Sequence, residues 1–286
     1  MCPGLSQKKL KPGLYLVATP IGNLTDMTTR GRDILAAADM VLCEDTRVTG
    51  KLLSHLGIRV PLQVYNDQSE KADFTPLLDR IKGGQVVALV SDAGMPLMSD
   101  PGYKLVRACQ QADVMVTSAP GANAILTALQ LSGLAPDTFL FGGFLPHKKG
   151  DRRARFQELA AVPATLIFFE RASRAGAALQ DAADILGGDR MGAVARELTK
   201  LFEEVRQGTL SDLVADLERA PIKGEVVLVI SRGEGACAHS TPDMRALLTA
   251  EMKKGPLRAA VDTVVALTGR QRREVYDLAL KIRDQK

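Results

Sequence analysis

The amino-acid sequence predicts an α/β protein built from two α/β domains and a small helical module at the C-terminal end. Short apolar runs alternate with amphipathic segments through the first half of the chain, which is typical of a mostly parallel sheet covered by helices on both faces. The chain has 286 residues, more than one small core accommodates. From residue 241 onward only helix patterns occur. We expect α/β domains over residues 13–129 and 130–232, and the helical module over 241–286.

In the first domain we expect five strands, each followed by a helix. The strands are short runs of β-branched and apolar residues, at 13–19, 40–44, 60–65, 86–90 and, with its turn, 114–121. Apolar residues three or four apart mark the helices, with Thr28 or Asp26 as the first N-cap and Gly57 as a C-terminal stop. These helices are expected at 28–38, 45–57, 74–84, 103–112 and 122–133.

In the second domain the same patterns predict a mixed sheet with helices. Strands are expected at 139–146, 165–170, 191–199 and 225–230, with an edge strand or turn at 202–210. Helices are expected at 152–161, 176–186 and 210–218. Residues 231–243 are polar and rich in glycine, which indicates a linker. Beyond it, three short helix patterns indicate a helix-turn-helix-like module, a helical cap or a dimerisation arm.

Composition favours a soluble globular protein without a metal centre. Hydrophobic residues make up 46% and charged residues 24%, and no apolar run reaches the length of a membrane span. The opening MCPGLSQKKLKPG lacks the apolar core of a signal peptide, so we expect a short disordered lead. The cysteines and histidines stand singly, which predicts a reducing cytoplasm, Cys43 and Cys109 in the core, and no metal site.

The net charge of +4 is concentrated at one end of the chain. Residues 241–286 hold ten Lys and Arg against six Asp and Glu, so the rest of the chain is neutral. Such a concentration is expected of a segment that meets a polyanion. A solvated helical surface would explain the charge equally well.

Three loops at the C-terminal ends of expected strands are rich in Gly, Pro and Asp. They are ATPIGNLTD at 18–26, SDAGMPLMSDPG at 91–102 and SAPGANA at 118–124. Ligands of doubly wound sheets bind at this edge, glycine lets a ligand approach the backbone, and proline fixes the loop. We therefore expect a ligand pocket here. The P-loop, the GxGxxG fingerprint and the GxSxG elbow are absent.

Seven ordered motifs resemble the bacterial 16S ribosomal RNA (cytidine) 2′-O-methyltransferase family, which belongs to the tetrapyrrole-methylase-like enzymes. They are LVATPIGNLTDMTTR, CEDTR, SDAGMPLMSDPG, SAPGANAILTAL, FGGFLP, ARELTKLFEEV and KGEVVLVI. The resemblance covers about residues 14–230, and the C-terminal module resembles that of the same family. Met95 stands where this family usually has Thr, so a hydroxyl is missing from that loop.

The resemblance implies two α/β domains of the tetrapyrrole methylase type with S-adenosylmethionine in the cleft between them. On the first domain it implies cofactor contacts from Pro20, Asp92, Ala93, Gly94, Pro96, Ser118, Ala119, Pro120 and Gly121. On the second domain it implies contacts from Phe169, Glu170, Ala195, Arg196, Glu197, Leu198, Gly224 and Glu225. For Asp92 the alternative is a turn cap.

The sequence defines less well which residues would act on the hydroxyl that accepts the methyl group. Glu44, Asp45 and Lys200 are the catalytic candidates, with Glu203 and Glu204 nearby in sequence, because a carboxylate or amine can assist proton removal from a hydroxyl. An ion-pair network that braces the domains is the alternative. Candidates for RNA contacts are the basic residues of CEDTR and HKKGDRRAR: Arg47, Lys148, Lys149, Arg152 and Arg153.

The resemblance implies a methyltransferase that uses S-adenosylmethionine to methylate the 2′-hydroxyl of a cytidine in 16S ribosomal RNA of the small subunit, and the scattered cysteines indicate a cytoplasmic location. The resemblance also implies a homodimer. A tetrapyrrole C-methyltransferase is one alternative, although a small macrocycle needs neither basic segment. A non-catalytic RNA-binding or assembly protein is the other, although the retained glycine loops argue against it.

Overall fold

The computed structural model describes residues 10–66, 68–69, 73–233, 244–253, 255–268 and 272–283. The predicted N-terminal lead and most of the predicted linker lie outside the described residues, as do Cys2, Cys237 and His239. The chain divides into two compact units. One holds residues 1–158 and 165–231, and the other holds residues 159–164 and 232–286.

The first sheet is fully parallel, which confirms the predicted strand pattern. Its five strands lie in the order β3-β2-β4-β1-β5. They are β1 (Gly13–Val17), β2 (Met40–Cys43), β3 (Leu62–Val64), β4 (Val86–Leu89) and β5 (Val116–Ala119). Because β1 and β4 are neighbours at the centre, the loops that follow them meet at the carboxyl edge of the sheet.

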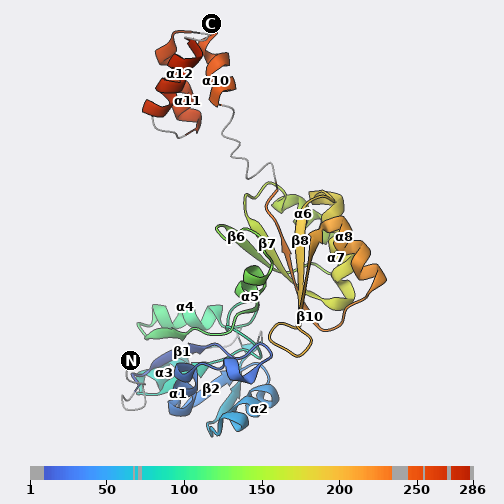
Figure 1. The fold of residues 1–286 in the computed structure, drawn as a ribbon. Helices are drawn as coiled ribbons and strands as arrows, with labels where there is room; N and C mark the ends of the chain where they lie inside the picture. Colours follow the sequence, from blue (N-terminus) through green and yellow to red (C-terminus); the bar gives the residue numbers. More distant parts are fainter. Residues whose placement is uncertain are drawn as a thin grey trace. The chain divides into compact units, whose positions relative to one another are not determined.

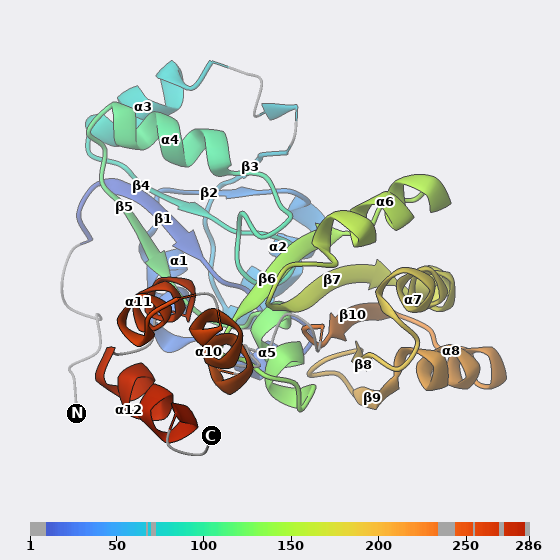
Figure 2. The ribbon, with the colours of Figure 1, turned by 90° about the horizontal axis from the view of Figure 1, so that it is seen from above.

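Helices cover both faces of this sheet, as Figure 2 shows. The helices α1 (Thr29–Ala37) and α2 (Thr46–Leu56) contribute buried apolar residues to one face. The helices α3 (Thr75–Lys82) and α4 (Tyr103–Gln111) do the same on the other. Cys43 and Cys109 lie buried in these two clusters as predicted.

Local chemistry sets the helix ends. The Thr28 hydroxyl accepts a hydrogen bond from the backbone N–H of Gly31 at 3.0 Å, so Thr28 is the N-cap of α1. Asp26 instead ends a short 3₁₀ turn, η2 (Leu24–Asp26). Asp45 caps α2, and Gly57 ends it in the left-handed region at φ 70°.

The second sheet is mixed, as predicted, with β9 at its edge. Its order is β6-β7-β10-β8-β9, and only β6 and β7 run parallel. The strands are β6 (Phe139–Phe144), β7 (Thr165–Arg171), β8 (Met191–Arg196), β9 (Glu204–Thr209) and β10 (Glu225–Ile230). The helices that accompany them are α5 (Ala124–Leu131), α6 (Lys149–Leu159), α7 (Ala172–Leu186) and α8 (Leu210–Arg219).

The helix α5 packs against the second sheet. Ile125, Ala128 and Leu129 share a buried cluster with residues of β7, β8 and β10. The expected boundary at residue 130 falls inside this helix, so we propose that the second domain begins at the loop before α5. Ile21, from the loop after β1, belongs to the same cluster.

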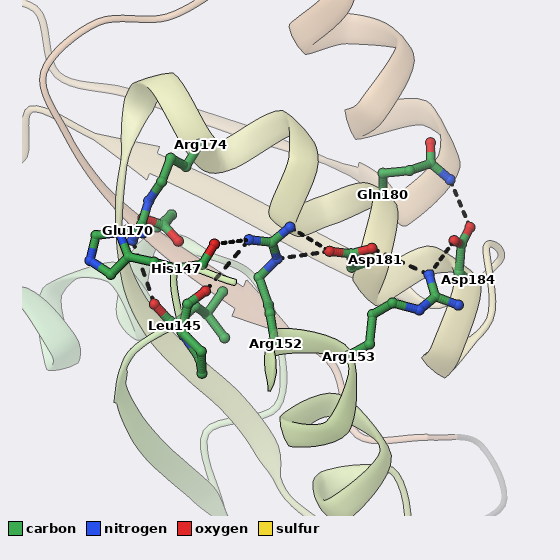
Figure 3. A network of polar contacts seen from close by, with 10 residues as sticks. Leu145, His147, Arg152, Arg153, Glu170, Arg174, Gln180, Asp181 and Asp184 are labelled. Atoms are coloured by element: carbon green, nitrogen blue, oxygen red, sulfur yellow. Dashed lines mark hydrogen bonds and ion pairs between the residues drawn. The ribbon is translucent and has the colours of Figure 1, made fainter. Parts of the chain in front are cut away.

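A buried ion pair joins α6 to α7 (Figure 3). Arg152 of α6 and Asp181 of α7 are 5% and 1% exposed. Nε and Nη2 of Arg152 lie 2.8 and 2.5 Å from Oδ2 of Asp181. Arg153 reaches Asp181 and Asp184 from the same helix. Charged side chains thus join these two helices.

The second unit contains the three predicted helices, which Figure 1 shows at the C-terminal end. They are α10 (Met244–Met252), α11 (Leu257–Thr268) and α12 (Arg272–Arg283). Leu248, Val261, Val264, Val275 and Ala279 form their buried core. Among the described residues, no helix has both the length and the apolar character required to cross a membrane.

Two glycines of one helix should respond to alanine in opposite directions. Gly57→Ala is expected to lower the free energy of unfolding by about 1 kcal/mol, because φ 70° is unfavourable for a residue with a Cβ. Gly50→Ala should raise it by about 0.5–1 kcal/mol, because Gly50 lies inside α2 and its Cβ would meet only Leu62, at 4.0 Å. Urea unfolding of both variants checks the signs. Two changes of the same sign would contradict this account.

Asp181→Ala is expected to destabilise the fold by about 3–5 kcal/mol, because it leaves the Arg152 charge buried without its partner. The double variant Arg152→Met with Asp181→Leu should lose less, since no buried charge remains. Chemical denaturation followed by circular dichroism compares the two. A double variant as unstable as the single one would show that the pair does not set this cost.

Candidate functional site

A cavity of about 380 Å³ lies where the carboxyl-edge loops of the first sheet meet the second sheet. This volume is within the range of about 300–1,000 Å³ typical of small-molecule sites. Loop residues on the first-sheet side line it: Ile21, Asp92, Ala93, Gly94, Met95, Met98, Ser99 and Asp100. The remaining lining comes from Asn123, Ala124, Ile125, Phe144, Phe169, Glu170, Arg171, Ala195, Leu198, Gly224, Glu225, Val226 and Val227.

Backbone hydrogen bonds join the loop after β4 to the loop after β1. The N–H of Gly94 donates to the carbonyl of Thr19 at 3.0 Å, and the N–H of Thr19 donates to the carbonyl of Gly94 at 2.9 Å. The Thr19 hydroxyl donates to the Ser91 carbonyl at 3.1 Å. Leu97 and Ser99 adopt φ of 73° and 71° in the same loop. The wall is therefore a fixed backbone surface with local strain, a feature that concentrates at functional sites.

A second strained loop, residues 197–203, follows β8 opposite this wall. Glu197 and Thr199 have φ of 48° and 65°. The Glu197 carboxylate accepts the backbone N–H of Glu225 at 3.0 Å, and Lys200 Nζ lies 3.2 Å from Glu197 and 2.7 Å from Glu225. A Cβ on Gly224 would lie 2.2 Å from the Glu197 Oε1 atom. Because Gly224 also has φ of 94°, a side chain at this part of the cavity wall would be strained and would displace the Glu197 carboxylate.

Asp100 lines the cavity, and the pKa of its carboxyl is raised. Burial raises the pKa of its carboxyl to about 6, and the negative charges of Glu44 and Asp92 add to the rise, while a hydrogen bond with Ser91 opposes it. A group that titrates near neutral pH can exchange a proton under physiological conditions. Sequence patterns did not single out Asp100, although it stands in the loop that they marked.

About half of the residues expected to contact the cofactor line the cavity. They are Asp92, Ala93, Gly94, Phe169, Glu170, Ala195, Leu198, Gly224 and Glu225. The others lie outside the lining: Pro20, Pro96, Ser118, Ala119, Pro120, Gly121, Arg196 and Glu197. Some of these support the wall. Glu197 braces Gly224 and Glu225, and the Ser118 carbonyl accepts a bond from Arg30 at 2.9 Å.

Asp92 makes a long-range contact in addition to lining the cavity. Its Oδ1 atom accepts the backbone N–H of Asp45 at 3.2 Å, which links the loop after β4 to the start of α2. The same side chain lines the cavity. One carboxylate thus positions the loop and faces the ligand space.

The three catalytic candidates lie outside the cavity lining. Hydrogen bonds from the side chain and backbone of Arg47 lower the pKa of Asp45 to about 2, so Asp45 is a poor proton acceptor. Burial disfavours the charge of Lys200, but its bonds to Glu225 and Glu197 outweigh burial and raise its pKa. Lys200 is therefore a charged brace. Glu44 acts on the site through its charge beside Asp100.

Met95 replaces the missing hydroxyl with a sulfur contact. Nδ2 of Asn123 donates to Sδ of Met95 at 3.3 Å, while Oδ1 of Asn123 accepts the N–H of Leu126 and caps α5. Both residues line the cavity. The loop after β4 and the start of α5 are thus linked through a thioether, a weak acceptor.

The candidate RNA-contact residues fall into two groups. Lys148 and Lys149 are exposed, and the Arg47 side chain is 86% exposed although paired with Asp45. Arg152 is buried, and its guanidinium is held by Asp181, as Figure 3 shows. Arg152 therefore has a structural role in α6, and its buried guanidinium does not offer a surface contact for RNA. Arg153 is partly exposed and paired with Asp181 and Asp184.

Comparison with known proteins places the chain in a family. The model described as Tetrapyrrole (Corrin/Porphyrin) Methylases matches residues 13–214, and the RsmI C-terminal HTH domain matches residues 238–283. The structure of the methyltransferase CobJ is similar with a TM-score of 0.57 at 17% identity, covering 77% of this chain and 94% of that chain. This similarity confirms the predicted fold.

Relatives named ribosomal RNA small subunit methyltransferase I resemble the chain over nearly its whole length. The protein of Mesorhizobium japonicum is 45% identical and the match covers 97% of this chain and 94% of the relative. The protein of Vibrio cholerae is 44% identical, with 94% and 95% covered. The chain therefore belongs to the tetrapyrrole methylase family and, within it, to the group of the ribosomal RNA small subunit methyltransferase I proteins.

Proposed function

We propose that this protein transfers a methyl group from S-adenosylmethionine to the 2′-hydroxyl of a cytidine in 16S ribosomal RNA. The observation that carries the proposal is the cavity of about 380 Å³ enclosed by glycine-containing loops, in a chain whose relatives are named small-subunit ribosomal RNA methyltransferases. The proposal includes a cytoplasmic location and a homodimer, which the family resemblance implies.

The cavity residues fit the methyl donor. Gly94 and Gly224 have φ of 83° and 94° and expose backbone to the cavity, which suits close approach of a nucleoside. Asp92 and Asp100 supply negative charge for a ligand with an amino group and a sulfonium. Val226, Val227 and Ile125 supply an apolar surface. When bound, S-adenosylmethionine supplies an electrophilic methyl group.

In this proposal the chain contributes alignment and proton acceptance. The rigid walls hold two reactants in line, which can supply much of the rate of a transfer reaction. We assign proton acceptance from the 2′-hydroxyl to Asp100, because its pKa of about 6 suits a base near neutral pH better than that of Asp45, which is about 2. Lys200 and Asp45 keep supporting roles.

Labelled S-adenosylmethionine, incubated with purified small ribosomal subunits and in parallel with naked 16S RNA, tests the activity. We expect label at one ribose, mapped by cleavage that is sensitive to ribose methylation. Asp92→Ala should reduce transfer about 10- to 100-fold because a charged hydrogen-bond partner is lost. Asp79→Ala, in α3 and outside the cavity lining, is the control. Donor binding without any label in RNA would refute the proposal.

The affinity for S-adenosylmethionine should rise as the pH increases from about 5 to about 7. The pKa of Asp100 is raised, so its carboxyl is neutral below about pH 6 and anionic above it, and a cationic ligand favours the anion. Asp100→Asn should remove most of this dependence. S-adenosylhomocysteine, which lacks the sulfonium charge, should show a weaker dependence with wild-type protein. Calorimetric titration at three pH values measures both, and a pH slope that Asp100→Asn leaves unchanged would exclude Asp100 as its source.

A further inference from the structure

The end of β6 is bent so that Phe144 faces the cavity. Phe141 pairs with Ile167 of β7, but the next pair is Phe144 with Phe169, so β6 contains one extra residue, a β-bulge. Gly143 has φ of 70°, and a Cβ on Gly142 would lie 2.3 Å from the Phe168 ring. The two glycines therefore permit the bulge. Bulges beside active sites often redirect a side chain.

The bulge leaves Phe144 as the outer member of three contacting rings. The Phe144 ring centroid lies 5.4 Å from that of Phe169, which lies 4.9 Å from that of Phe141. Phe144 lines the cavity and is 57% exposed, whereas Phe141 and Phe169 are only partly exposed. An exposed ring held in place by a second ring is a preformed surface for stacking.

In the sequence, exposed cations follow this ring after a loop that two arginines hold in place. Nη1 of Arg152 lies 3.5 and 3.4 Å from the carbonyl oxygens of Pro146 and His147, and Nη2 of Arg174 lies 3.5 Å from that of Leu145 (Figure 3). Both arginines are themselves paired, with Asp181 and Glu170. Lys148 lies just before α6 and Lys149 is its first residue, and both side chains are exposed.

We propose that Phe144 is the platform on which a nucleobase of the acceptor RNA stacks, with Lys148 and Lys149 contacting the adjoining phosphates. This inference rests on the proposed function and adds a substrate subsite to it. An exposed aromatic ring followed four and five residues later by two exposed lysines matches single-stranded RNA, which offers planar bases joined by phosphates. Phe144 is more than half exposed and so lies at the rim, whereas the donor is assigned to the glycine-lined interior.

Methyl-transfer kinetics on purified small ribosomal subunits test the platform with four proteins. Phe144→Ala should lower kcat/KM about 5- to 150-fold, the range given by loss of one stacked base, mainly through KM, with donor affinity unchanged. Phe144→Trp should retain activity because it keeps an aromatic face. Phe139→Ala is the matched control, since Phe139 lies on the same strand, is 42% exposed and is outside the cavity lining. It should behave as wild type.

A second measurement concerns the lysines. Replacing Lys148 and Lys149 together by alanine should reduce the slope of log KM against log salt by about one to two, because fewer counterions are released.

Wild-type kinetics for the Phe144→Ala variant would overturn the proposal that Phe144 is a stacking platform. So would a loss of donor affinity that matches the loss in kcat/KM, since the ring would then serve the donor's adenine. Wild-type protein that binds donor but methylates no RNA would refute the proposed function itself, a result distinct from these.

Discussion

The reciprocal hydrogen bonds between Thr19 and Gly94 hold the loop after β1 against the loop after β4. These loops follow β1 and β4, which are neighbours in the parallel sheet, and the Thr19 hydroxyl adds a bond to the Ser91 carbonyl. A Cβ at Gly94 would lie 3.2 Å from Ile21, which lines the cavity and also belongs to the core of the second sheet. The backbone bridge at Gly94, with the bonds of the Thr19 hydroxyl and the Asp92 carboxylate, thus sets the position of the cavity wall.

Backbone strain is also found in the loops around the cavity. Of the five non-glycine residues with positive φ in the described part of the chain, four are Leu97, Ser99, Glu197 and Thr199, in the two loops beside the cavity. Each such residue costs on the order of 1–3 kcal/mol, so the surrounding contacts must hold it. One of these contacts comes from Asn23, whose backbone N–H donates a hydrogen bond to the Thr199 hydroxyl at 3.1 Å. A cavity with fixed walls loses little entropy when a ligand binds.

Several charged residues of the motifs that resemble the family act as braces rather than as reactive groups. Asp45 with Arg47 and Lys200 with Glu225 form close ion pairs, which fix the positions of these side chains. Arg152 forms a buried pair of the same kind with Asp181. Asp100 differs because burial and neighbouring acids, instead of a cation, set its pKa. The contrast separates groups that fix the loops from the one suited to proton transfer.

The sequence by itself determined most strands and helices, the helix end at Gly57 and the loops that form the cavity, because hydrophobic period and glycine conformation act over a few residues. It left Thr28 or Asp26 as the first N-cap, and the structure selects Thr28. The family motifs added the ligand class. Only the tertiary structure decided which residues of those loops face the cavity. Asp100 and Phe144 face it because of the turns at Leu97 to Gly102 and the bulge at Gly143, and Arg152 is buried because Asp181, 29 residues away, lies opposite it. Such contacts join distant segments, so no local pattern encodes them.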